Sequence, residues 1–103
     1  VTLSGGQKQR MSIARSVVKN PTILLLDDCL SAVDTKTEER ILKRLKPIIQ
    51  AKTTIIVSHR ISSIKNADHI LVVEDGTVVQ SGKHKDLVNS KGYYQLIYME
   101  QHP

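Results

Sequence analysis

The sequence is poor in cysteine and in large aromatic side chains, and it has no long apolar run. Cys29 is its single cysteine, and the 103 residues include neither phenylalanine nor tryptophan. One cysteine excludes an internal disulfide, which is typical of a reducing compartment. No apolar stretch reaches the roughly 20 residues that a membrane-spanning helix needs, and no signal-peptide pattern is present. The first residue is not methionine, and it lies just before a predicted helix cap, so we expect a piece of a longer protein.

Acidic residues are fewer than basic ones. The chain has 15 lysines and arginines against 10 acids, a net charge of +5 and a pI near 9.5. Such a balance can indicate a nucleic-acid partner or an anionic membrane surface. The basic residues are scattered among the acids, however, which is typical of a solvated surface. We therefore expect no nucleic-acid partner.

The residues around Gly5 and Gly6 predict a phosphate-binding helix start. Ser4 precedes Gln7 by three residues, the spacing of a capping box, and apolar residues at helical spacing extend the helix to about Lys19. Two glycines allow the backbone to come close to a ligand, because no Cβ stands in the way. The N-terminus of a helix offers unpaired N–H groups and the positive end of the helix dipole to an anion.

Two apolar strands are predicted to end in polar side chains. Residues 23–26 form an apolar run that ends in Asp27 and Asp28, and residues 53–57 form a β-branched run that leads to His59. A continuous apolar run is typical of a parallel strand buried on both faces. Strand–helix–strand order favours parallel pairing, which brings both strand ends to one edge of the sheet, where such sheets bind ligands.

Several of these segments together resemble the ATP-binding cassette (ABC) ATPases. Residues 3–7 (LSGGQ), followed by KQRMSIAR, resemble the signature motif, and residues 23–27 resemble Walker B. Residues 31–34 resemble the D-loop, and His59 resembles the switch histidine. In that family the signature motif reaches across a dimer to the γ-phosphate of ATP held by the Walker A loop of the partner.

The resemblance implies a role for each matching residue. Asp27 would hold Mg²⁺ through water beside the phosphates, and Asp28 and His59 would be catalytic. The residues implied to contact ATP, chiefly that of the partner chain, are Leu3, Ser4, Gly5, Gly6, Gln7 and Asp34.

The rest of the sequence, together with these motifs, predicts an α/β fold. Thr35 and Glu38 have capping-box spacing at the start of a second helix, which Pro47 should end or kink near Lys46. A short helix, a hairpin with an Asp-Gly turn and two terminal helices follow, and we expect the tyrosines of the last helix to pack on the domain. The resemblance implies a partial P-loop NTPase fold without its Walker A half, with a mostly parallel sheet flanked by helices. Residues 1–103 would be the C-terminal portion of one ATPase domain, with the signature helix in 1–20 and Walker B onward in 21–103.

Asp28 departs from the family pattern, because ABC ATPases usually carry glutamate there as the base that activates water. The aspartate side chain is one methylene shorter and would lie back from that water. Intact LSGGQ with an altered acid resembles heterodimeric exporters in which one of the two ATP sites is degenerate. The alternative is a homodimer in which aspartate works adequately as the base.

The resemblance therefore implies an ATPase of the exporter type, at the cytoplasmic face of the membrane. Its partners would be a second ATPase domain, in a heterodimer by preference, and the transmembrane domain of its own transporter. Without Walker A, the 103 residues alone should hydrolyse no ATP.

Two alternative functions remain open. One is a soluble ABC ATPase of DNA repair, chromosome structure or translation, and the other is a regulatory module in which bound nucleotide only holds a dimer together. The transported substrate is not encoded in these residues.

Overall fold

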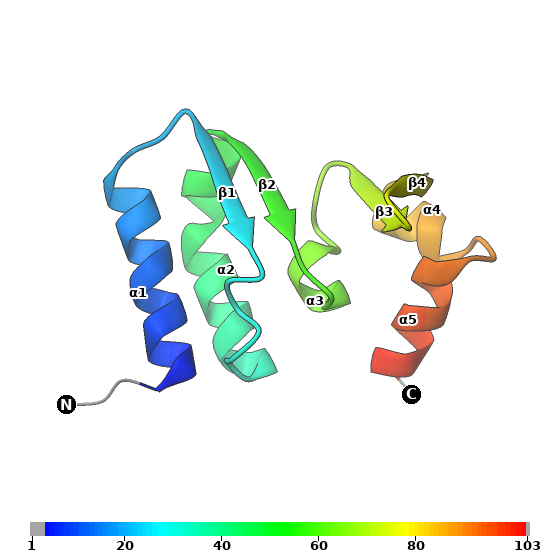
Figure 1. Ribbon diagram of the computed structural model, residues 1–103, viewed down its shortest axis with the longest axis horizontal. Coiled ribbons are helices and arrows are strands. Elements are labelled where there is room, and N and C mark those ends of the chain that lie inside the picture. Colours follow the sequence, from blue (N-terminus) through cyan, green and yellow to red (C-terminus); the bar gives the residue numbers. More distant parts are fainter. Residues whose placement is uncertain (1–3, 103) are drawn as a thin grey trace. The chain divides into compact units, whose positions relative to one another are not determined.

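The computed structural model describes residues 4–102 and divides into two compact units, with the boundary after Ser63. Figure 1 shows the elements in chain order. The first unit contains α1 (Gly5–Val18), β1 (Ile23–Asp27), α2 (Thr35–Gln50) and β2 (Thr53–Val57). The short helix α3 (Ile61–Ile64) crosses the boundary. The second unit contains β3 (Ile70–Glu74), β4 (Thr77–Gly82), α4 (His84–Val88) and α5 (Tyr93–Gln101). The α/β class predicted from the sequence is confirmed.

Both ends of α1 follow from local chemistry. The Gln7 N–H donates to Ser4 Oγ at 3.2 Å and the Ser4 N–H donates to Gln7 Oε1 at 2.9 Å, so the predicted capping box is present. Asn20 ends the helix in the left-handed region with φ of 49°, a conformation that asparagine tolerates. Lys52 binds the Asn20 side chain at 2.7 Å and the carbonyl of Pro21 at 2.6 Å. These bonds fix the turn into β1.

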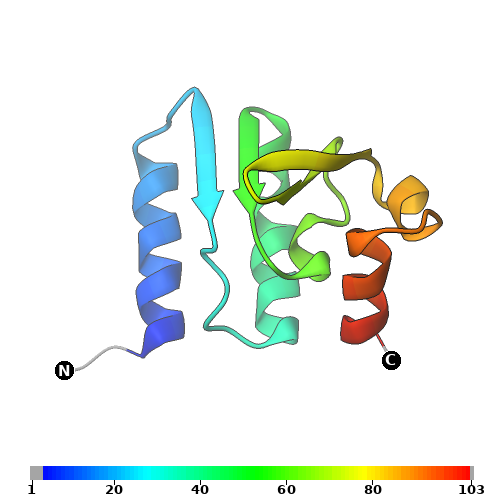
Figure 2. The ribbon, with the colours of Figure 1, turned by 45° about the vertical axis from the view of Figure 1, so that its right-hand side comes forward.

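The strands β1 and β2 pair in parallel, as predicted, with Ile23 opposite Thr53 and Asp27 opposite Val57. Figure 2 shows their arrows running the same way, together with α1 and α2. Among residues 4–102 the strands form two separate two-stranded sheets rather than one.

The helices of the first unit cover only one face of this sheet. Leu24 and Leu26 are buried, at 1% and 4% exposure, whereas the alternating residues Ile23 and Leu25 are 59% and 56% exposed. The prediction of burial on both faces is therefore wrong for this structure. Ile13 of α1 packs with Leu30 and Val33 in the core below the covered face, against partly buried side chains of α2. The other face of the sheet is apolar and open.

The helix α2 begins and ends differently from the prediction. Its N-cap is Asp34, and Glu38 is buried in an ion pair instead of completing a capping box with Thr35. Pro47 lies inside the helix, which continues to Gln50. The proline stands in the last turn, where its missing N–H removes a single helical bond. Its carbonyl still accepts from the Ala51 N–H at 3.2 Å.

The second unit is a hairpin packed with two helices. The strands β3 and β4 are antiparallel, and the turn residues Asp75 and Gly76 have φ of 50° and 75°, as an Asp-Gly hairpin turn requires. The Gln80 side chain of β4 accepts from the Tyr94 N–H at 3.3 Å, which joins the hairpin to the start of α5. No helix within residues 4–102 is long and apolar enough to span a bilayer.

The tyrosines of α5 do not behave alike. Tyr94 is 2% exposed and its hydroxyl lies 2.7 Å from His84 Nδ1, whereas Tyr93 is 46% exposed. Successive helical residues point about 100° apart, so the two side chains leave the helix in different directions. The packing prediction is confirmed for Tyr94 and wrong for Tyr93. Tyr98, one turn after Tyr94, lies edge-on to the ring of His84.

We expect acid to loosen the second unit through His84. Burial, with the positive charges of Lys65 and His102, lowers the pKa of His84 below its ordinary value. The unfolded chain therefore binds the proton at a higher pH than the folded one, and stability falls as the pH drops through the unfolded pKa near 6.5. Hydrogen exchange of α5 amides, corrected for intrinsic rates, should accelerate between about pH 8 and about pH 5.5.

His84→Gln should remove much of this acid sensitivity, because the amide can still bond with Tyr94 but does not titrate. His69→Gln, which changes an exposed histidine of the same unit, is the matched control and should behave like wild type. Equal acid sensitivity in wild type and His84→Gln would contradict the prediction.

Candidate functional site

Three predicted site residues meet at one edge of the first sheet. Asp27 lies opposite Val57 in the parallel register, and the Asp28 N–H donates to the Val57 carbonyl at 2.7 Å. The chain therefore leaves β1 and β2 at the same edge. Asp27, Asp28 and His59 are all exposed there, the histidine two residues beyond β2. This is the arrangement that the parallel-sheet prediction requires.

Asp28 has a backbone conformation that suits a short acid. Its φ is 52°, in the left-handed region that aspartate enters more readily than most residues. The Asp28 N–H bonds with β2, and its carbonyl accepts from Gln9 Nε2 at 3.3 Å. The peptide on both sides of this residue is thus held by neighbouring elements.

The start of α1 has its side chains engaged and its first amides available. Ser4 and Gln7 bond with each other in the capping box, so neither side chain points freely outward in this structure. The amides of Gly5 and Gly6 precede the first intrahelical bond, which runs from the Lys8 N–H to the Ser4 carbonyl at 3.0 Å. They are the groups of this turn best placed for an anion. Leu3 lies outside the described residues.

The two glycines also pack against the segment that follows β1. A Cβ on Gly5 would lie 3.2 Å from Ala32 Cβ, and one on Gly6 would lie 3.0 Å from Val33 Cγ1 and 3.3 Å from the Ala32 carbonyl oxygen. Any larger residue at position 6 therefore pushes on the backbone of this segment. The sequence predicts that these glycines let the backbone come close to a phosphate. The structure adds a second reason for them, which is their close packing against the 28–34 region.

Residues 28–34, called the 28–34 segment below, connect the sheet edge to α2 and are held from α1 by Gln9. The Gln9 Nε2 group donates to Ser31 Oγ at 2.8 Å, and the Ala32 N–H donates to Gln9 Oε1 at 2.8 Å. One side chain thus uses both its amide donor and its carbonyl acceptor on the same segment. Sequence reasoning had not singled out Gln9.

Asp34 ends the 28–34 segment as an exposed acid. The Thr37 hydroxyl is the main cause that lowers the pKa of Asp34, with a smaller contribution from the charge of Arg40. The carboxylate therefore stays ionised well below neutral pH. It is an acceptor that can receive hydrogen bonds from a nucleotide or from a partner protein.

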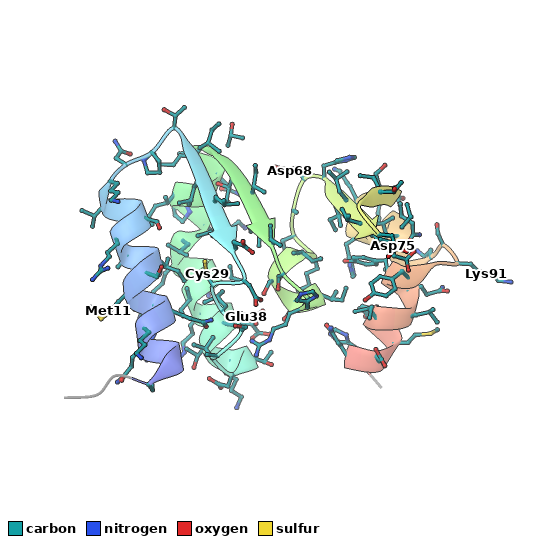
Figure 3. All side chains as sticks on the ribbon, in the orientation of Figure 1. Met11, Cys29, Glu38, Asp68, Asp75 and Lys91 are labelled. Carbon is teal, nitrogen blue, oxygen red and sulfur yellow. The ribbon has the colours of Figure 1, made fainter. Side chains whose placement is uncertain are left out.

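Glu38 and Arg60 form a second group that sequence reasoning missed. Glu38 is fully buried, and its carboxylate accepts from Arg60 Nη1 at 2.5 Å and from Ser62 Oγ at 2.6 Å. Figure 3 labels Glu38 on α2 and Cys29 in the turn after β1. The available signal was the arginine directly after His59, since a buried acid needs a cation partner elsewhere in the chain.

Cys29 is partly buried within the 28–34 segment. Burial is the main cause that raises the pKa of its thiol, and the nearby charges of Asp27 and Asp28 raise it further. Its thiol lies 3.6 Å from the Asp27 carbonyl oxygen. A thiol with these properties reacts slowly while the segment stays in place.

The carboxylate of Asp27 fits one kind of metal site. Residues 4–102 contain no group of three or more His, Cys, Asp or Glu side chains that could enclose a metal ion. Mg²⁺ in nucleotide sites uses one or two carboxylates together with waters and substrate phosphates. A single exposed carboxylate at a strand end suits that pattern and does not suit an all-protein cage.

Comparison with known proteins gives consistent similarities. A family model described as "ABC transporter" matches residues 1–31. A probable multidrug resistance ABC transporter ATP-binding/permease protein of Bacillus subtilis is 50% identical over 101 residues, which are 98% of this chain and 17% of that protein. An ATP-dependent lipid A-core flippase of Methylobacillus flagellatus is 45% identical, with the same two coverages.

The comparison with solved structures agrees with these sequence similarities. A bacterial Atm1-family ABC exporter with ATP bound matches 98% of this chain and 18% of that chain, with 44% identity and a TM-score of 0.91. The chain thus spans less than a fifth of the length of the relatives it matches. The names of these relatives favour the exporter prediction over the soluble ATPase alternative.

Proposed function

Since this chain belongs to the ABC transporter family, as part of an ATP-binding domain, we propose that it is the C-terminal portion of the ATPase domain of an exporter. Residues 1–20 would supply the signature helix, and residues 21–103 would supply Walker B to the end of that domain. The observation that carries the proposal is the shared sheet edge where Asp27, Asp28 and His59 emerge from paired strands. The whole protein would couple ATP binding and hydrolysis to transmembrane export.

Each group at the site has a chemical task in this proposal. The Gly5 and Gly6 amides, at the positive end of the α1 dipole, bind the terminal phosphate of ATP held mainly by a partner domain. His59 contacts the γ-phosphate of the chain's own nucleotide and orients the attacking water. Asp28 is the residue that can accept the proton of that water.

Asp27 would hold Mg²⁺, which when bound neutralises phosphate charge during phosphoryl transfer. The exposure of Asp27 supports this role, because a hydrated Mg²⁺ must be able to reach its carboxylate. Asp34, ionised and exposed at the start of α2, would contact the partner and its nucleotide.

We further propose that the parent protein is one half of a heterodimer. Its own site would hydrolyse slowly, because the Asp28 carboxylate is one methylene shorter than glutamate. Its intact glycine turn would complete the faster site of the partner. The left-handed backbone at Asp28 accommodates aspartate more readily than glutamate. The alternative is a homodimer in which aspartate suffices.

The remaining assignments follow from the same proposal. The partners would be a second ATPase domain and the transmembrane domain of the same transporter, which places this chain at the cytoplasmic face of a membrane. A drug-like, lipid-like or peptide-like substrate would bind in that transmembrane domain, away from these residues.

The test is ATP hydrolysis by the purified full-length protein, alone and with its partner half, in the presence of Mg²⁺ or of a chelator. We expect slow hydrolysis alone, much faster hydrolysis with the partner, and none with the chelator. Fast hydrolysis by the protein alone would remove the heterodimer proposal. Failure to hydrolyse ATP in either state would remove the ATPase proposal itself.

A further inference from the structure

We propose that Arg60 and Glu38 are positioning residues that lock the 28–34 segment in the conformation needed for ATP hydrolysis. The inference rests on the proposed ATPase function for its kinetic consequence, but its structural part can be tested without ATP. Neither residue belongs to the predicted nucleotide contacts, and both act through the backbone between Asp28 and Asp34.

The guanidinium of Arg60 connects three groups at once. Its Nη1 donates to Glu38 Oε2 and to the Leu30 carbonyl at 3.2 Å, and its Nη2 donates to the Ser31 carbonyl at 3.2 Å. The planar fork of arginine allows this, whereas a lysine ammonium presents its donors from a single atom. Arg60 thereby bonds two consecutive carbonyls of the 28–34 segment.

Glu38 holds the arginine in this orientation. Its side chain is completely buried, while that of Arg60 is 32% exposed. One carboxylate oxygen accepts from Arg60 and the other from Ser62, so both oxygens are satisfied. A buried carboxylate without a cation is strongly unfavourable, so Arg60 is held against Glu38 and, with it, against the segment.

Gln9 holds the same segment from the other side. It bonds with the Asp28 carbonyl, the Ser31 hydroxyl and the Ala32 N–H, all between residues 28 and 32. The segment is therefore fixed between the first helix and the chain that follows His59. Displacement of either contact would move Asp28, Asp34 and the packing surface of Gly5 and Gly6 together.

The native Cys29 thiol provides a reporter within the segment. Trypsin is expected to release residues 20–36 as one peptide containing this single cysteine, so mass spectrometry can follow its alkylation whatever other cysteines the full-length protein has. The experiment measures N-ethylmaleimide labelling of Cys29 in the folded full-length protein without nucleotide, at one pH.

Arg60→Lys is the informative variant. It keeps a positive charge near Glu38, and thus the fold, but it lacks the fork that reaches the Leu30 and Ser31 carbonyls. We expect Cys29 to be labelled about tenfold faster than in wild type, and kcat for ATP hydrolysis to fall about tenfold, with KM for ATP changed less than about twofold. Glu38→Gln keeps an acceptor atom for Arg60 and adds a donor. Its Cys29 labelling rate and its kcat should therefore lie between those of wild type and Arg60→Lys.

Two exposed neighbours on α2 provide matched controls. Glu39→Gln and Arg44→Lys make the same chemical changes on the solvent side of the helix, and both should label and hydrolyse like wild type. Thermal unfolding measured on every variant separates loosening of the segment from loss of the fold, since a merely structural role would lower the melting temperature without changing labelling well below it.

Labelling of Cys29 at the wild-type rate in Arg60→Lys would overturn the proposal, whatever the ATPase result. Faster labelling with unchanged kcat would also overturn it, because the segment would then be loose without consequence for hydrolysis. A wild-type protein that hydrolyses no ATP would instead overturn the proposed function, and the labelling result would still show whether Arg60 holds the segment.

Discussion

Gly6→Val should reduce ATP hydrolysis by the assembled dimer about 10²-fold or more. A Cβ at this position already lies 3.0 Å from Val33 Cγ1 and 3.3 Å from the Ala32 carbonyl, and valine adds two methyl groups to it. Val33 is buried in the core with Ile13 and Leu30, so it cannot move aside freely. The helix start must shift instead, which moves the amides that we propose to bind the phosphate of the partner's ATP.

Ala14→Val is the control, because it places the same side chain on an exposed position of the same helix. Valine in a helix costs less than about 1 kcal/mol relative to alanine, so this variant should keep its activity. Steady-state hydrolysis and a thermal melt of both variants check the prediction. Activity of Gly6→Val within about threefold of wild type would contradict the role assigned to the glycine turn.

Asp28→Glu should raise hydrolysis by the full-length protein alone about tenfold. A well-positioned general base contributes roughly 10²–10⁴-fold, and glutamate extends the carboxylate by the methylene that aspartate lacks. The gain should fall below that range, since Asp28 already places a carboxylate there and has φ of 52°, a conformation that glutamate tolerates less well. We therefore expect a small loss of thermal stability together with the gain in kcat.

The control is Asp68→Glu, which lengthens an exposed acid in the second unit. It should change neither kcat nor the thermal stability. The measurement is kcat for each full-length variant at saturating ATP and Mg²⁺. Strong wild-type hydrolysis that Asp28→Glu does not raise would mean that aspartate already acts as an adequate base, and the degenerate-site proposal would fall.

The sequence allowed much of the fold to be predicted because its signals are local. The capping box of Ser4 and Gln7, the Asp-Gly turn and the β-branched strand 53–57 each depend on neighbouring residues, and all three are present. The convergence of Asp27 and His59 needed one further step, the parallel pairing of two strands, which strand–helix–strand order favours strongly.

What the sequence did not predict depends on contacts between distant residues. Glu38 has capping-box spacing from Thr35, but its carboxylate is buried with Arg60, 22 residues away. The open face at Ile23 and Leu25 was also missed, since an apolar run does not reveal which of its faces a helix covers. The three bonds of Gln9 to the 28–34 segment are likewise invisible before the fold is known.

The most direct test of the central claim compares Asp27→Asn with Gly6→Val in the full-length protein assembled with its partner half. If the glycine turn serves the fast site of the partner while Asp27 serves a slow site of its own, Asp27→Asn should keep most of the ATP hydrolysis and Gly6→Val should lose nearly all of it. Equal and nearly complete loss in both variants would contradict the account, because it would mean that this chain's own sheet edge carries as much of the hydrolysis as its glycine turn.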